Sequence, residues 1–168
     1  MRVRHVGREH AQFAEFYRLH RAACLKAVVA ATGDRQGAED LVAEAFTRAW
    51  MSWRKVSRHP APQGWVVRTA LNARVSAWRR RRREVALADM HDVVVDRDPG
   101  GVDATLMAAL RQLPARQREV IALRVFLDLD TCATAGVLGI AAGTVSAHLS
   151  RAVATLRGQL APANSRGE

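Results

Sequence analysis

The side chains that could perform catalysis are dispersed along the chain. The acidic residues lie mainly on predicted helix faces or in one short segment, and the six histidines are scattered. No GxSxG, HExxH or phosphate-loop pattern occurs, and Cys24 and Cys132 lack the CxxC spacing of a zinc site. The sequence therefore predicts a protein that is not an enzyme and that holds neither a metal nor a cofactor. Each cysteine is expected to fill a helix interior as a small apolar side chain.

The charge of the chain predicts a polyanionic partner, either nucleic acid or an anionic membrane surface. The formal net charge is +10 and the pI is about 11.3. All but Lys26 and Lys55 of the 26 basic residues are arginine, which binds phosphate and base edges bidentately. Codon bias in a GC-rich genome explains the arginine content equally well. The sequence shows neither a signal peptide nor an apolar run of membrane-span length, so we expect a cytoplasmic protein without membrane contact.

Residues 129–156 have the pattern of a helix-turn-helix. A helix over 129–138 is followed by Gly139, which suits a left-handed turn, and by a second helix that opens near residue 143. In this motif the second helix enters the major groove of DNA by its N-terminal end. The alternative is an ordinary helical hairpin. The inward positions of the second helix are Val145, Leu149 and Ala152, and the polar positions nearest DNA are Thr144, Ser146, His148 and Arg151.

A second cluster, within residues 57–83, is typical of single-stranded DNA binding. Aromatic rings that stack on bases alternate here with arginines that follow phosphates, next to a loop with two prolines and a glycine. The alternatives are that the tryptophans are core residues, that Asn72 makes a helix-packing hydrogen bond, and that the arginine run is a solvated tail. The candidate residues are Trp65, Arg68, Asn72, Arg74, Arg79 and Arg80, and Trp78 is expected to be a core residue.

Helical periodicity predicts that both clusters lie on α-helices. Apolar residues recur at helical spacing over about 9–31, 37–56 and 65–83, with a stop and a new cap at residues 32–34 and a loop at 59–64. Acidic residues are expected in the first turns of the second helix. In the second half, Pro114 separates two short helices that precede the helix-turn-helix. The predicted fold class is all-α.

A reversal of charge indicates two small helical domains. Residues 50–84 carry ten basic residues and one acidic residue, whereas five aspartates and one arginine follow up to residue 103, together with a Pro-Gly-Gly break. We therefore expect a first domain over 1–87, a flexible acidic linker over 88–103, and a helix-turn-helix domain over 104–168.

Both halves resemble the bacterial sigma factors of the extracytoplasmic-function (ECF) group. The first half is similar to the family's domain 2, and the second to its domain 4, in the family's order and with a linker between them. The segments that carry the resemblance are AEDLV at 38–42, Phe46, Trp50, WVVRTALN at 65–72, LP at 113–114, QREV at 117–120, LGI at 138–140, GTV at 143–145 and LSRA at 149–152.

The resemblance implies a sigma factor that binds core RNA polymerase and directs promoter-specific initiation, including promoter melting. It implies that Asp40, Leu41, Glu44 and Phe46 contact the core enzyme. It also implies that residues 57–80 melt and bind the minus-ten element, and that residues 144–151 bind the minus-thirty-five element. An anti-sigma protein is a further candidate partner.

Several residues depart from the family pattern. Ala43 stands where glutamine is usual, Leu71 where arginine is frequent, and Ala141 where a capping side chain is common. Residues 131–134 are less acidic and less aliphatic than usual, and Ser146 and His148 occupy commonly basic positions. Two other function classes therefore stay open: a helix-turn-helix regulator that does not engage core polymerase, and a nucleic-acid enzyme whose catalytic set is missing.

Overall fold

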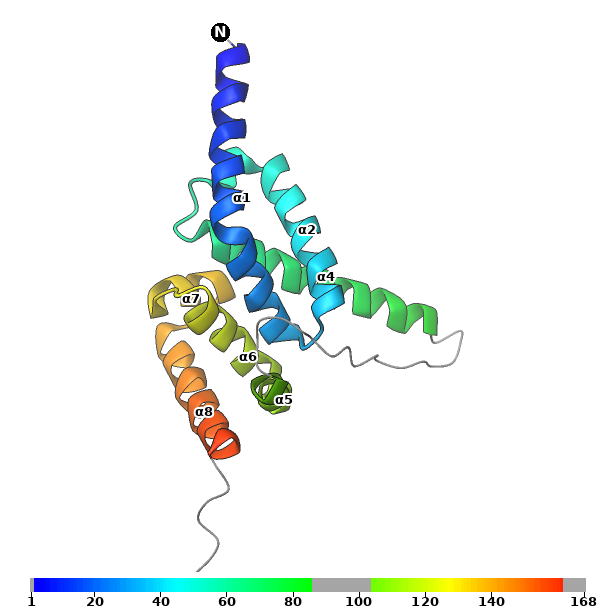
Figure 1. Ribbon diagram of the computed structural model, residues 1–168, viewed down its shortest axis with the longest axis vertical. Helices are drawn as coiled ribbons and strands as arrows, with labels where there is room; N and C mark the ends of the chain where they lie inside the picture. Colours follow the sequence, from blue (N-terminus) through cyan, green and yellow to red (C-terminus); the bar gives the residue numbers. More distant parts are fainter. Residues whose placement is uncertain (1, 86–103, 162–168) are drawn as a thin grey trace, which may run out of the picture.

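The computed structural model describes residues 2–85 and 104–161, and the side chains of 7–76 and 104–161 (Figure 1). These residues form helices without any strand, so the predicted all-α class is confirmed. The expected linker over 88–103 lies outside the described residues. The elements are α1 (Arg2–Thr32), α2 (Arg35–Met51), α3 (Trp53–Val56), α4 (Pro62–Val85), α5 (Ala104–Gln112), α6 (Ala115–Ile121), the π-helix η1 (Ala122–Phe126), α7 (Thr131–Leu138) and α8 (Ala142–Leu160).

The turn between α1 and α2 forms as the sequence predicts. Gly33 has a φ of 74°, a left-handed conformation that costs glycine little. Asp34 then caps α2, because its side chain accepts a hydrogen bond from the Gly37 N–H at 3.1 Å. Since α2 already begins at Arg35, the acidic residues expected in its first turn lie beyond that turn.

Two expected helix boundaries in the first half are wrong. The single helix expected over 37–56 is interrupted at Ser52, which ends α2 and precedes the one-turn helix α3. The loop expected over 59–64 ends early, because α4 begins at Pro62. Proline is favoured at a first helical position, where its missing N–H leaves no hydrogen bond unmade.

Aromatic rings and small residues form the core of the first half. The Phe13 ring lies 5.2 Å from the Trp53 ring and 6.5 Å from the Phe46 ring, measured between centroids, so the start of α1 is fixed to α2 and α3. Further along α1, Cys24 is fully buried, as expected. Cys132 is exposed at the start of α7, so the expectation that both cysteines are interior is wrong for Cys132.

The two cysteines should differ sharply in reactivity toward a thiol reagent. Burial raises the pKa of the Cys24 thiol to about 12, and only the thiolate is nucleophilic. We expect one cysteine to react with Ellman's reagent in the native protein and two in guanidinium chloride. The Cys132→Ser variant should show no rapid native reaction, whereas rapid labelling of this variant would contradict the burial of Cys24.

Helices α5–α8 form the second half. Between α6 and α7 the chain widens into the π-helix η1, where the Leu127 N–H donates to the Ala122 carbonyl at 3.2 Å. Asp128 follows with a φ of 51°. Pro114 separates α5 from α6, as expected, and lies at the N-cap of α6.

The two halves pack against one another through α1, α4, α6, α7 and η1, and their buried residues form one continuous cluster. In Figure 1, α5 and α6 lie beside the lower part of α1, and α8 lies on the far side of α6. One close approach between the halves involves Gly64 in the first turn of α4. A Cβ atom at this position would lie 2.7 Å from Cγ2 of Val137 and 3.0 Å from Cδ1 of Leu129.

Two arginines of the second half bind main-chain carbonyls at the end of α1. Arg111 donates to the Gly33 carbonyl from Nε at 3.1 Å and from Nη2 at 2.8 Å. Arg118 donates to the carbonyls of Ala31 at 3.0 Å and Leu113 at 2.7 Å. Burial lowers the pKa of Arg118, and the positive charge of Arg74 lowers it further. The residue is therefore held close to a like charge on α4 by carbonyl acceptors.

Within the described ranges, no single helix is long and apolar enough to cross a membrane. Helices α7 and α8 meet the length and composition criteria only as a pair, and they are bent by 103° at the turn between them. This pair is the predicted helix-turn-helix.

Candidate nucleic-acid interface

The α7–α8 pair has the predicted helix-turn-helix geometry. Gly139 ends α7 with a φ of 65°, which confirms the expected left-handed turn. On α8, Val145 and Ala152 are fully buried, and Leu149 packs against the core. The inward face of α8 is therefore the predicted one, and the opposite face is left for a partner.

The predicted DNA-reading residues of α8 are not equally accessible. Thr144, Ser146 and Arg151 are exposed. The Ser146 hydroxyl donates to the Ala142 carbonyl at 3.3 Å, so part of its hydrogen-bonding capacity is used within the helix. His148 is half-buried, and its Nδ1 atom is enclosed without a partner in the described part of the chain. Thr144 and Arg151 are thus the best placed of the four.

Ala141 and residues 131–134, which depart from the family pattern, affect the capping of α8 and the interior of α7. Ala141 is the N-cap of α8 and provides no side-chain cap. In contrast, Asp130 caps α7 by accepting a hydrogen bond from the Ala133 N–H at 2.7 Å. Thr134 is fully buried, and its hydroxyl has no hydrogen-bond partner among the residues described. An aliphatic side chain at this position would leave no buried polar group unpaired.

Two residues of the predicted single-strand-binding cluster meet in one cavity. We name it the Asn72 pocket; its volume is about 400 Å³, and it is formed by α2, its C-cap residue and α4. Trp65 lies half-buried in its wall, and Asn72 is exposed. The lining residues are Arg48, Met51, Ser52, Trp65, Thr69 and Asn72.

The α2 side of the Asn72 pocket was not predicted. Arg48 is ion-paired with Glu44 at 2.6 Å, and Met51 is 79% exposed, which is unusual for a large apolar side chain. The sequence feature that marks this side is the end of α2 at Ser52. A serine alone is a weak signal for a helix end, because neither glycine nor proline lies nearby.

Two of the arginines predicted beside Asn72, Arg68 and Arg74, do not line its pocket. Arg68 is half-buried, while Arg74 is exposed on the side of α4 that faces Arg118. The side chains of Trp78, Arg79 and Arg80 lie outside the described ones, although the helical backbone of α4 continues through them to Val85. The cluster is therefore divided between the pocket and the rest of α4.

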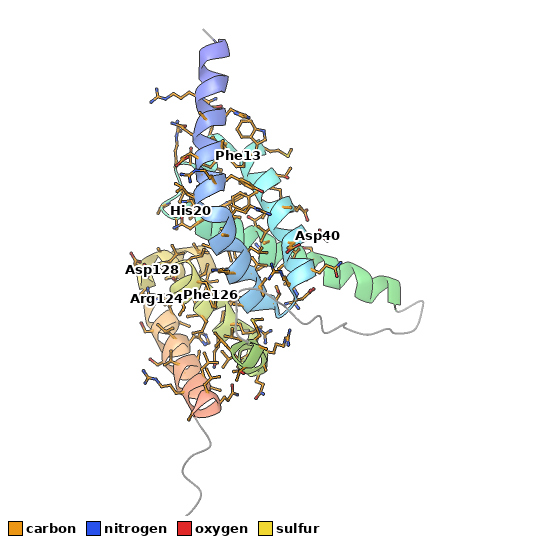
Figure 2. All side chains as sticks on the ribbon, in the orientation of Figure 1. Phe13, His20, Asp40, Arg124, Phe126 and Asp128 are labelled. Atoms are coloured by element: carbon orange, nitrogen blue, oxygen red, sulfur yellow. The ribbon has the colours of Figure 1, made fainter. Side chains whose placement is uncertain are left out.

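The predicted polymerase-binding residues of α2 lie on different sides of the helix. Asp40 and Glu44 are exposed, and Leu41 is half-buried (Figure 2 labels Asp40). Phe46 is only 3% exposed and lies 4.9 Å from the Tyr17 ring and 5.9 Å from the Phe16 ring, between centroids. The ring is thus part of the core in this structure, and its contact with core polymerase stays a prediction. Ala43, which departs from the family pattern, is exposed.

Comparison with known families matches the two halves of the chain to different family models. The family described as Sigma-70 region 2 matches residues 15–84, and the one described as Sigma-70, region 4 matches residues 103–156. The RNA polymerase sigma-E factor of Streptomyces avermitilis is 32% identical over 152 residues, which cover 89% of this chain and 85% of that protein. The ECF RNA polymerase sigma factor SigL of Mycobacterium tuberculosis is 32% identical over 157 residues, 89% of each chain. The chain belongs to the ECF sigma factors.

Solved structures of sigma factors share this fold. The sigma factor RpoE, solved with the anti-sigma factor NepR from Bartonella quintana, is 26% identical with a TM-score of 0.75, over 89% of this chain and 96% of that one. CnrH, solved with the cytosolic domain of CnrY, is 22% identical with a TM-score of 0.62, over 90% and 88% of the two chains, and shows the fold alone. The prediction of a sigma factor is confirmed, and a regulator that does not engage polymerase is not favoured. The Asn72 pocket lies within the region 2 match, and α8 begins within the region 4 match.

Proposed function

We propose that this sigma factor opens promoter DNA by binding one unpaired base of the minus-ten element in the Asn72 pocket. The observation that carries the proposal is the meeting of Trp65 and Asn72 with the end of α2 in one cavity. Removal of a base from the stack costs a few kcal/mol, which hydrogen bonds to its edge offset. The Asn72 amide supplies both a donor and an acceptor, and Trp65 supplies an aromatic surface.

The remaining roles follow from which side chains stay exposed. Asp40 and Glu44, with half-buried Leu41 between them, bind core polymerase. Thr144 and Arg151 bind the minus-thirty-five element, with smaller contributions from Ser146 and His148. Arg68, Arg74, Arg79 and Arg80 attract the phosphates of the opened strand. Residues 1–87 and 104–168 act as the two domains, joined by 88–103.

The proposed role is non-catalytic and cytoplasmic, since a sigma factor acts with polymerase on promoter DNA. An anti-sigma protein is a proposed second partner. This proposal is supported by RpoE, whose structure was solved in complex with an anti-sigma factor and which this chain resembles in sequence as well as in fold.

Reconstituted transcription tests the proposed function. Core polymerase together with this protein should start RNA chains at specific sites on a DNA fragment library, whereas either component alone should not. A protein that is folded by circular dichroism but forms no complex with core enzyme in gel filtration would contradict the proposal.

Replacing Arg151 by alanine should weaken duplex binding by the second half. If its guanidinium acts on a phosphate, the loss should be similar across DNA sequences, and the slope of log K against log salt should fall by about one. Fluorescence anisotropy at several salt concentrations measures both quantities. Arg157→Ala, farther along α8, is the control with the same change of charge. Normal affinity and normal discrimination in the Arg151 variant would show that the reading face of α8 is elsewhere.

A further inference from the structure

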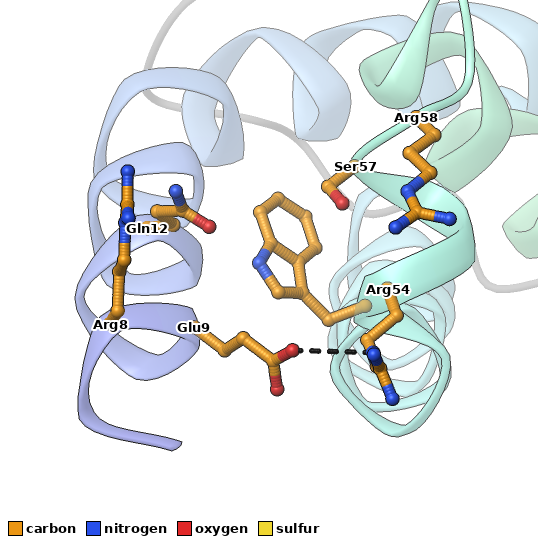
Figure 3. A pocket seen from close by; sticks show the side chains of 7 residues that line it. Arg8, Glu9, Gln12, Arg54, Ser57 and Arg58 are labelled. Carbon is orange, nitrogen blue, oxygen red and sulfur yellow. Dashed lines mark ion pairs between the residues drawn. The ribbon is translucent and has the colours of Figure 1, made fainter. Parts of the chain in front are cut away.

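The two halves of the molecule differ in the charge that they offer to DNA. In the first half, three arginines and a single glutamate line a cavity of about 240 Å³ between α1 and α3 (Figure 3). Figure 3 shows its one carboxylate, on Glu9, paired with Arg54 at 3.4 Å. In the second half, α8 has no lysine, arginine, aspartate or glutamate from Ala142 to Ser150. Helix α8 can therefore distinguish DNA sequences only through uncharged groups and Arg151.

Three outward side chains of α8 share one face of the helix. Thr144, Ala147 and Arg151 are spaced at i, i+3 and i+7, and the buried Val145 and Ala152 lie on a different side. Thr144 and Arg151 are exposed, and Ala147 is half-buried. This face therefore presents the hydroxyl and the γ-methyl group of Thr144, the β-carbon of Ala147 and one guanidinium group.

Ser146 and His148 have little hydrogen-bonding capacity left for a base. The Ser146 hydroxyl donates to the Ala142 carbonyl at 3.3 Å, and Nδ1 of His148 is enclosed without a partner among the residues described. Each side chain thus keeps at most one polar group for DNA. Guanine is read chiefly by arginine or lysine, which bond its O6 and N7 atoms together. Before Arg151, α8 has no residue that can do so.

The start of α8 is open to a close approach by a partner. A Cβ atom at Gly143 would meet no atom within 4 Å, and the φ of this glycine is not positive. The fold therefore does not require glycine here, although glycine is less favourable than alanine in a helix. The missing side chain lets a partner come close to the backbone directly beside Thr144.

We propose that α8 reads the minus-thirty-five element chiefly through the C5-methyl groups of thymines in the major groove. Thr144 contacts one of these groups with its γ-methyl group, and Ala147 contacts a neighbouring one with its β-carbon. Threonine and alanine are among the side chains that make this apolar contact. Arg151 adds one charged contact. The inference rests on the proposed function, because it requires α8 to lie in the major groove of that element.

Replacement of thymine by uracil tests this mode of reading. Uracil pairs with adenine as thymine does but lacks the C5-methyl group, so the hydrogen bonds of the base pair are kept. The probe is a promoter fragment recovered in the reconstituted transcription experiment and resynthesised with deoxyuridine in its minus-thirty-five element. Holoenzyme assembled from core polymerase and the full-length protein should bind this fragment about fourfold more weakly for each contacted methyl group, the value of one buried methyl group. Competition against the labelled thymine fragment measures the ratio.

Thr144→Ser tests the residue, because it removes the methyl group of the protein and keeps the hydroxyl. Holoenzyme with this variant should bind the thymine fragment about fourfold more weakly. The effect of uracil should then be smaller than in the wild type by the same factor, since one partner of the contact is already absent. Thr155→Ser is the control, about three turns farther along α8, where the hydroxyl donates to the Arg151 carbonyl at 3.0 Å. It should match the wild type on both fragments.

The possible failures separate this inference from the proposed function. Equal binding of the thymine and uracil fragments by the wild type would overturn the inference, as would a uracil effect that Thr144→Ser leaves at full size. An equal loss from uracil placed only in the spacer between the two promoter elements would also overturn it, because that effect belongs to the duplex as a whole. Each of these results leaves the proposed function standing while the fragment is bound in preference to unrelated duplex DNA. If the wild-type holoenzyme binds the fragment no better than unrelated duplex, the proposed function fails as well.

Discussion

Replacing Asn72 by alanine should slow promoter opening by roughly 5- to 150-fold, while complex formation with core polymerase stays near normal. The change removes the hydrogen bonds that the amide makes to an unpaired base, a loss of about 1–3 kcal/mol. The folded protein should not suffer, because Asn72 is exposed and its side chain makes no hydrogen bond within the described residues. Alanine is also the stronger helix former. The structure thus disfavours the alternative that Asn72 is held by a packing hydrogen bond.

Permanganate reactivity of thymines near the start site measures the opening. The variant should show weak reactivity on duplex promoter DNA and near-normal activity on a template that already contains an unpaired bubble. The bubbled template is the control, because it removes the need to melt DNA but keeps every other step. Equal activity of variant and wild type on the duplex would remove Asn72 from the melting step.

Replacing Gly64 by alanine should push the two halves of the molecule apart. The new Cβ would lie 2.7 Å from Cγ2 of Val137 and 3.0 Å from Cδ1 of Leu129, and both neighbours are short, packed side chains. Overpacking of this kind costs about 1–3 kcal/mol. Within α4 itself, alanine stabilises the helix by up to about 1 kcal/mol relative to glycine. The expected loss of stability therefore comes from the contact between the two halves. We expect a lower thermal midpoint and a larger radius of gyration in small-angle scattering.

Gly136→Ala is the matched control for this change. Gly136 lies in α7, one residue before Val137, and a Cβ there meets no atom within 4 Å. The control should therefore be as stable as the wild type or more stable, with unchanged scattering. If Gly64→Ala behaved like Gly136→Ala, the contact between α4 and α7 would not hold the halves together.

The sequence predicts best those features that a helical period or a turn residue marks. The inward face of α8, the turn at Gly139 and the Asp34 cap were all predicted in place. The break at Ser52 was missed, because no glycine or proline marks it and helical spacing continues to Trp53. The π-helix was missed for the same reason, since its hydrogen-bond shift leaves no trace in residue types.

The candidate site was only half predictable from sequence. Trp65 and Asn72 lie two turns apart on one helix, so their meeting follows from periodicity. Ser52 and Arg48 reach the same pocket from another element, and only tertiary packing shows this. The burial of Phe46 was not predictable, because an aromatic residue on an amphipathic helix has the same spacing whether it faces a partner or its own core.

The hydrogen bonds from Arg111 and Arg118 to main-chain carbonyls stabilise the docking of the two halves. The fraction of docked molecules affects the binding of every partner that prefers either the docked or the undocked form. A partner that requires the halves apart has its intrinsic affinity multiplied by the undocked fraction of molecules, and a partner that binds the docked form has its intrinsic affinity multiplied by the docked fraction. Each 1.4 kcal/mol in the interface changes that balance tenfold. One acceptor is the main-chain carbonyl of Ala31, which substitution of the Ala31 side chain leaves in place. At Gly33, in contrast, a Cβ atom would lie 2.9 Å from Cγ of Arg111. Substitution of these two arginines can therefore change the balance between partners of the docked form and partners of the undocked form. It does so without altering a residue that is proposed to contact DNA.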